Sequence, residues 1–203
     1  MAEHYDVTNI TVRPGTHPKA LAALDNRLGK SGDLLACWYS EIGAVNQILI
    51  IRKAPDAAAA IAARRKELES SNPFGIGELI TGLSMDTYVS LDFVAPMTPG
   101  DFGPCYEVRN YVLKPGGVAP TIKLWRKAVP GRAAVSPLLA AMIAATGPAI
   151  RFMHIWPYKS FDERARLRDK AVADGVWPPP GGRDLLVSQH VDIYLPAPFS
   201  PLR

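Results

Sequence analysis

The chain has 203 residues, of which 48% are hydrophobic and 21% charged, and its formal net charge is +4 at pH 7. This composition is that of a globular protein with material for a core, and the length suits one large domain or two small ones. No apolar run approaches the roughly 20 residues that span a bilayer, and the basic residues interleave with acids, which argues against a nucleic-acid-binding surface.

The N-terminus and the cysteines indicate the compartment. The opening MAEHYDV lacks the basic and apolar regions of a secretory signal. Cys37 and Cys105 form no CxxC motif and occupy different places in the two halves of the chain, so no disulfide framework is expected. We therefore expect a cytoplasmic protein.

The first half is predicted to contain six elements in the order strand, helix, strand, strand, helix, strand. The first strand alternates and ends at a Pro-Gly turn, and the first helix ends at Gly29. A tight turn at Gly43 separates the two middle strands, and the second helix has a proline in its first turn. The predicted elements are 5–13, 17–29, 34–42, 44–53, 55–70 and 85–94.

The second half repeats this pattern. YDVTNITVRPG from Tyr5 matches YEVRNYVLKPG from Tyr106, which lies 101 positions later. Further on, GAVNQILIIRK and GPAIRFMHIWPY correspond, as do the two following helical stretches and the tails APMTP and APFSP. Four ordered matches indicate a tandem duplication. We expect the first helix of the second half to break at Pro130-Gly131, with later elements near 136–145, 149–157, 160–173 and 185–195.

The element order predicts the fold. A βαββαβ unit is ferredoxin-like, with helices on one face of its sheet. The other face is apolar and needs a cover, which a second copy in the same chain supplies. We therefore predict an α+β protein in which two tandem ferredoxin-like units, residues 1–99 and 100–203, form an intrachain α/β barrel.

The second half also resembles a known family, NIPSNAP. The resemblance implies a dimeric α/β barrel fold and an activity that is poorly defined. The sequence departs from the family pattern at Ile150, where asparagine is expected, and at Ile50, Arg52 and Ala54 in the first half. The matching positions are Tyr106, Glu107, Arg109, Tyr111, Lys114, Pro115, Gly116, Gly147, His154, Trp156, Tyr158, Arg164, Arg168 and Trp177, with a thinner match at Tyr5, Pro14, Gly15, Gly43, Asn46, Gln47 and Arg64.

Two sets of polar side chains predict a small-molecule site. Strand alternation places each set on one face of its strand, and the first and third strands of a ferredoxin-like sheet are neighbours. If both sets face the interior between the two sheets, they form a pocket in the second unit for a small, partly apolar molecule. The first unit, which lacks these side chains, would then be the structural half. The candidate ligand-binding residues are Glu107, Arg109, Tyr111, His154, Trp156 and Tyr158.

Three alternatives remain open at this stage. The same side chains can pack under helices, with Glu107 paired to Arg109 and His154 hydrogen-bonded. The protein can also be an interaction module without a pocket, whose barrel is only a scaffold, and a filled, closed interior would favour this. Alternatively, the protein is a cofactor-independent oxygenase or isomerase in which His154 acts as the catalytic base, because its ordinary pKa lies near neutrality.

The histidine spacing requires no cofactor. The four histidines form no HxxxH or HxH motif, so no metal site is predicted. Some relatives of this barrel fold hold haem through one histidine, and His154 or His190 could do so. Besides a small-molecule ligand, a second copy of the chain is the expected partner, because duplicated barrels often keep an outer edge or helix face for pairing.

One arginine in the second helix of each unit is predicted to be structural. Arg64 lies on a stripe with Ile61 and Leu68, and Arg168 lies on a stripe with Phe161 and Val172. An arginine on an apolar helix face needs an ionic partner, and the acids Asp6 and Glu107 are the candidates. The proline-rich segment after the last helix, GVWPPPGG, is expected to cover the barrel mouth.

Overall fold

The computed structural model describes residues 2–203 and has the predicted order of strands and helices in both units. Three short 3₁₀ turns complete it, at Pro73–Gly75, Gly77–Leu79 and Gly182–Leu185. The first unit contains β1 (His4–Val12), α1 (His17–Leu28), β2 (Leu34–Ile42), β3 (Gln47–Ala54), α2 (Ala57–Leu68) and β4 (Ile80–Ser90). The second contains β5 (Cys105–Leu113), α3 (Val118–Val135), β6 (Ala140–Ala144), β7 (Arg151–Tyr158), α4 (Phe161–Ala173) and β8 (Leu186–Pro196).

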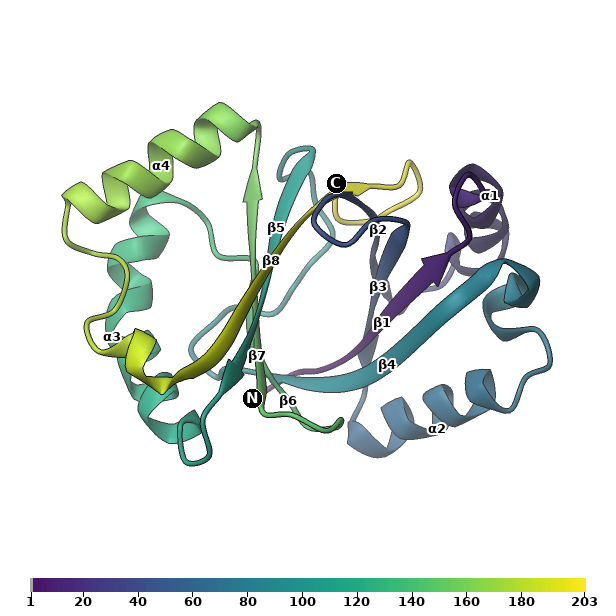
Figure 1. The fold of residues 1–203 in the computed structure, drawn as a ribbon, viewed down its shortest axis with the longest axis horizontal. Coiled ribbons are helices and arrows are strands. Elements are labelled where there is room, and N and C mark those ends of the chain that lie inside the picture. Colours follow the sequence, from purple (N-terminus) through teal and green to yellow (C-terminus); the bar gives the residue numbers. More distant parts are fainter. Residues whose placement is uncertain (1) are drawn as a thin grey trace.

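The eight strands form one closed barrel. Their order is β1-β3-β2-β8-β5-β7-β6-β4, and all neighbours are antiparallel. Each unit keeps the ferredoxin-like order, and the two sheets join edge to edge through the pairs β2–β8 and β4–β6. Closure satisfies the backbone groups that an open edge would expose. The predicted α+β fold with an intrachain barrel is confirmed, and Figure 1 shows the helices of the two units on opposite sides of the barrel.

The barrel interior is an apolar core shared by both units. Trp38 of β2 stacks on Tyr106 of β5, with ring centroids 4.1 Å apart. Val7 and Ile51 from the first unit belong to the same buried cluster as Ile155 from the second. This interior contact between the copies provides the cover that each sheet lacks when alone.

Several boundaries differ from the predictions, and two of the differences have a clear physical reason. Helix α3 continues through Pro130 to Val135, because residues on both sides of the proline, Val129 and Arg132, are buried against the sheet and tertiary packing outweighs the lost backbone hydrogen bond. Strand β4 begins at Ile80, five residues earlier than predicted, because its pairing with β1 extends that far.

The outer helices are rotated relative to the predicted apolar stripes. Ile61 and Leu68 on α2 are 51% and 55% exposed, and Val172 on α4 is 62% exposed. The buried residues are Ala60 and Glu67 on α2, and Ala171 on α4. Within residues 2–203, no helix has the length and apolar character needed to cross a membrane.

Candidate functional site

The two predicted polar sets do lie together, but outside the barrel. Strand β5 pairs with β7 so that Glu107 is opposite Trp156 and Arg109 is opposite His154. The interior faces of these strands carry the buried apolar residues Val108 and Ile155. Strand alternation therefore directs the polar side chains toward α3 and α4. The prediction of a pocket between the two sheets was wrong, because apolar side chains of both units fill that space.

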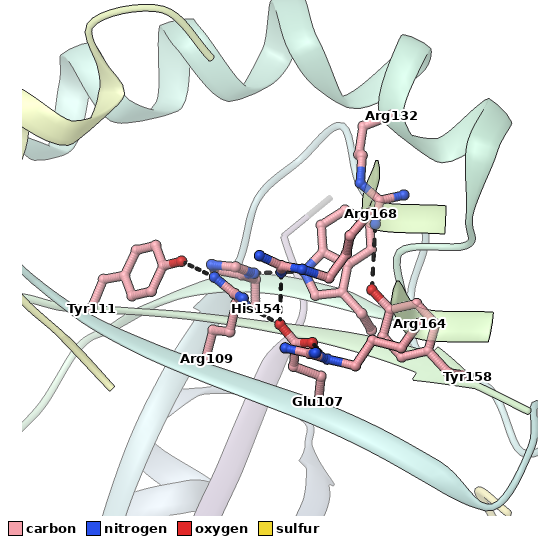
Figure 2. A network of polar contacts seen from close by, with 9 residues as sticks. Glu107, Arg109, Tyr111, Arg132, His154, Tyr158, Arg164 and Arg168 are labelled. Atoms are coloured by element: carbon pink, nitrogen blue, oxygen red, sulfur yellow. Dashed lines mark hydrogen bonds and ion pairs between the residues drawn. The ribbon is translucent and has the colours of Figure 1, made fainter. Parts of the chain in front are cut away.

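A buried carboxylate organises the layer between the sheet and α4. The side chain of Glu107 is 0% exposed and accepts hydrogen bonds from the Nε groups of Arg109 and Arg164. Arg168 donates from Nη1 to the same carboxylate at 3.2 Å. Figure 2 shows these guanidinium groups around Glu107. The predicted pairing of Arg168 with Glu107 is thus present.

The electrostatics of Glu107 favour its charged form. Burial alone would raise the pKa of Glu107, but the charge and hydrogen bonds of Arg109, followed by those of Arg164, lower it below the ordinary glutamate value. An ionised carboxylate can accept several hydrogen bonds at once. Glu107 therefore ties strand β5 to helix α4 as an anion.

Arg132 from α3 is a further cation, which the sequence reasoning missed. It is 2% exposed, its guanidinium lies 4.3 Å from the ring centroid of Trp156, and it donates to the Tyr158 hydroxyl at 3.3 Å. In Figure 2 it reaches Tyr158 from the helix above. Burial lowers the pKa of Arg132. Arg132 was not predicted as a site residue because the helix was expected to break at Pro130-Gly131. Only a helix that continues past Pro130 places Arg132 over the sheet.

His154 is held as a neutral ring. Its Nδ1 accepts a hydrogen bond from Trp156 Nε1 at 2.7 Å, which assigns the ring proton to Nε2. Within residues 2–203, Nε2 has no hydrogen-bond partner. Burial, followed by the positive charges of Arg109, Arg168 and Arg132, lowers the pKa of His154 well below its ordinary value. His154 can therefore donate a hydrogen bond, while its one lone pair is already used.

A cavity of about 210 Å³ lies beside this network. Its walls come from the outer face of the sheet, α3, α4 and the loop that leads into β8. Trp125 and Trp177 meet edge to face with ring centroids 4.8 Å apart. The aromatic wall residues are Tyr111, Trp125, Phe152 and Trp177, and the charged ones are Arg109, Arg168, Asp169 and Arg183.

Thr121 is a buried polar residue of the cavity wall. It comes from the first turn of α3, is only 4% exposed and lines the cavity. Within the described chain, its Oγ1 has no hydrogen-bond partner. A buried hydroxyl without a partner costs free energy, and this oxygen is buried within the wall and is not exposed to the cavity.

The predicted ligand-binding residues divide into two groups. Arg109 and Tyr111 line the cavity, with Arg109 donating from Nη1 to the Tyr111 hydroxyl at 2.7 Å. The other four, Glu107, His154, Trp156 and Tyr158, are buried and belong to the supporting layer. The segment around Trp177 covers this cavity, whereas the sequence placed it over the barrel mouth. Thr121, Trp125 and Phe152 were missed because no pattern marks them apart from core residues.

The first unit fills the equivalent space. Ile50, at the position of His154, and Ile48, at that of Phe152, pack with Leu24 and Phe74 in a buried cluster between sheet and helices. Asp6, the counterpart of Glu107, lies 3.6 Å from Arg52 rather than in an ion pair with Arg64. The predicted partner of Arg64 was therefore wrong, since the strand neighbour Arg52 reaches Asp6 first.

Neither candidate histidine fits haem. His154 is 1% exposed behind the rings of Tyr111 and Trp125, and the adjacent cavity is smaller than the roughly 300–1,000 Å³ typical of sites for drug-sized ligands. His190 is 61% exposed, with Nε2 at 3.0 Å from Asp192. Within residues 2–203, no group of three or more His, Cys, Asp or Glu is arranged to hold a metal ion.

Known proteins match the second unit in sequence and the whole chain in fold. The NIPSNAP family model matches residues 106–201. A protein titled NipSnap homolog from Dictyostelium discoideum is 33% identical over 72 residues, which are 36% of this chain and 32% of that protein. The chain thus spans about a third of the length of that relative.

Two solved structures are similar. One is a NIPSNAP family protein from Agrobacterium tumefaciens, with 32% identity, a TM-score of 0.46 and coverage of 49% of this chain and 98% of that one. The other is titled an anthrone oxidase-like protein, with 11% identity, a TM-score of 0.67 and coverage of 96% and 91%, and this likeness concerns the fold alone. Because the NIPSNAP family protein from Agrobacterium tumefaciens is 32% identical and is covered to 98% of its length, and because the family model matches residues 106–201, the chain belongs to the NIPSNAP family.

Proposed function

We propose that this protein binds a small, partly apolar molecule in the cavity between the second sheet and helices α3 and α4. The observation that carries the proposal is a cavity of about 210 Å³ whose wall combines the aromatic side chains of Tyr111, Trp125, Phe152 and Trp177 with the cationic side chains of Arg109 and Arg168. Aromatic walls with a few convergent polar groups are the usual composition of a small-molecule site.

The duplication supports the same proposal. The first unit, residues 1–99, packs aliphatic side chains where the second unit, residues 100–203, has the cavity and its supporting network. One copy can then serve as the structural half while the other carries the site. Arg64 belongs to the structural half in this assignment, and Arg168 serves both as partner of Glu107 and as a cavity wall.

Catalysis by His154 as a base has less support. A general base needs a free lone pair within reach of its substrate, whereas Nδ1 already accepts from Trp156 and the ring lies behind the cavity wall. The fold likeness to an anthrone oxidase-like protein adds no support for an activity, because the identity is 11%. An interaction module without a pocket is disfavoured by the cavity itself.

Native mass spectrometry of the protein purified from the cells that produce it tests the proposal. We expect a retained small molecule in the wild type and its loss in Val172→Trp. Val172 lines the cavity and is 62% exposed, so an indole at this position reaches over the opening with little effect on the core.

The matched control is Leu68→Trp. Leu68 occupies the equivalent position on α2 and is 55% exposed, so this variant carries the same new side chain on the first unit, where Leu68 borders only an open surface hollow formed by α2 residues. Retention should be unchanged in this control. Equal retention in Val172→Trp, or no retained molecule in the wild type, would contradict the proposed site.

The predicted homodimer and cytoplasmic location stay predictions. Light scattering during size-exclusion chromatography would measure the mass of the particle against the 22.0 kDa chain. Microscopy of the tagged protein in its own cells would test the location.

A further inference from the structure

We infer that the ligand of this cavity carries a carboxylate on an aromatic ring, with Arg109 and Arg168 binding the carboxylate and the indole and phenyl walls binding the ring. The inference rests on the proposed binding function and adds the chemical class of the ligand. It depends on the charge balance of the site, the unused donors and the size of the cavity.

The charge balance of the layer is positive. Arg109, Arg164 and Arg168 all contact Glu107, and Arg132 lies over the neighbouring Trp156. Three guanidinium groups thus contact one carboxylate and a fourth lies nearby, while Asp169 and Arg183, which also line the cavity, carry opposite charges. Unbalanced charge in a partly buried layer is costly, so a second anion in the adjoining cavity would be stabilised there.

Two of these cations have donors left on the cavity wall. Arg109 donates from Nε to Glu107 and from Nη1 to Tyr111, and among residues 2–203 its Nη2 group has no acceptor. Arg168 donates from Nη1 to Glu107, and in the same part of the chain its Nη2 and Nε groups have none. Both side chains line the cavity, whereas Arg164 does not. Guanidinium groups match the planar geometry of a carboxylate, which favours this anion as the ligand's polar end.

The remaining walls select the body of the ligand. Trp125 meets Trp177 and Phe152 edge to face, at 4.8 and 4.5 Å between ring centroids, so flat apolar surfaces and ring edges border the space. A dry cavity of about 150 Å³ holds benzene, and this cavity of about 210 Å³ therefore has room for one aromatic ring with a short carboxylate group.

Calorimetric titration of the ligand-free protein with phenylacetate and phenylacetamide tests the inference. The two probes have nearly the same shape and differ in charge. We expect the carboxylate to bind at least about tenfold more tightly than the amide, since hydrogen bonds between charged groups are stronger than those to a neutral amide, and we expect added salt to reduce only the carboxylate affinity. This comparison uses the wild type alone and does not depend on any variant folding.

Two variants on one helix locate the contact. Arg168→Gln should weaken phenylacetate binding about tenfold, with no change for the amide. Arg164→Gln removes another partner of the same Glu107 but lies off the cavity wall, so it should weaken phenylacetate binding clearly less than Arg168→Gln does, through the lost charge alone, and leave amide binding unchanged. Thermal melts of both variants control for the shared loss of an ion pair.

The outcomes separate the two proposals. Equal affinity for the amide and the carboxylate would overturn the inference about charge and leave the cavity as a binding site. Equal weakening by Arg164→Gln and Arg168→Gln would overturn direct contact with Arg168. If neither probe binds, the ligand class is wrong, and the binding function itself is judged by the retained molecule and its displacement in Val172→Trp.

Discussion

Trp156 donates its indole Nε1–H to Nδ1 of His154 over 2.7 Å, between two side chains that are 3% and 1% exposed. The residues are two positions apart on β7 and therefore point to the same face of the sheet. A buried N–H that loses its acceptor costs about 1–3 kcal/mol. The primary role of His154 in this structure is thus to accept this hydrogen bond inside an aromatic cluster.

Replacing His154 tests this role. His154→Leu keeps an apolar side chain of similar size but leaves the Trp156 N–H without an acceptor, so we expect a loss of about 1–3 kcal/mol in the free energy of unfolding. His154→Asn keeps an oxygen near the position of Nδ1 and should lose less for this bond. Urea denaturation at pH 7 measures both. A leucine variant as stable as the wild type would show that the hydrogen bond contributes little.

The equivalent position in the first unit should behave as simple core. Ile50 is 0% exposed in the aliphatic cluster under α1, so Ile50→Ala should cost roughly 2–5 kcal/mol through lost burial and a new cavity. Ligand retention per folded molecule should not change. Thermal denaturation measures the stability, and native mass spectrometry measures the retention. If the variant stays folded but loses the retained molecule, the first unit is not simply the structural half.

The duplicated acids are expected to differ in their response to pH. The pKa of Glu107 is lowered from 4.5, so its favourable contribution is present above that value and is lost as pH falls through the folded-state pKa. Glu107→Gln should therefore cost about 3–5 kcal/mol at pH 7, because it leaves buried guanidinium groups without their anion. The cost should shrink as the pH is lowered below about 4.5.

The pKa of Asp6 is shifted in the opposite direction from that of Glu107. Burial raises the pKa of Asp6 from 3.8 more than the nearby Arg52 lowers it, so the favourable contribution exists at low pH and disappears as pH rises through the folded-state pKa. Asp6→Asn should consequently lose less stability at pH 7 than Glu107→Gln. Unfolding curves of both variants between pH 3 and pH 7 measure the contrast, and equal costs at pH 7 would be inconsistent with it.

Both thiols should be unreactive in the folded protein. Burial, with a smaller effect of Asp25, raises the pKa of Cys37 to about 12, and burial also raises the pKa of Cys105. Only the thiolate reacts quickly with alkylating reagents. Iodoacetamide at pH 8 should label both cysteines after unfolding in urea and neither before it, as measured by intact mass. Rapid labelling of native Cys37 would contradict its burial.

The sequence determined the architecture because its signals are local and repeated. The strand motif from Tyr5 and its copy from Tyr106, each ending in Pro-Gly, marked the two units, and the alternation on β5 and β7 placed Arg109 on the same face as His154. The pairing of Arg168 with Glu107 was expected because an arginine on an apolar helix stripe needs an ionic partner, and the pair is present although that stripe is largely exposed. These inferences require only strand and helix periodicity and the cost of burying charge.

The tertiary structure decided which side of the sheet holds the site. Strand alternation groups side chains by face but does not say which face of the sheet meets the second sheet. In the structure, the apolar residues Val108 and Ile155 face the barrel interior, so the polar residues face the helices. The cavity wall also depends on Thr121 of α3 and Trp177 beyond α4, which no sequence spacing links to β5. Packing between distant segments, and not any local pattern, leaves the space between sheet and helices open in the second unit and filled by apolar side chains, Phe74 among them, in the first.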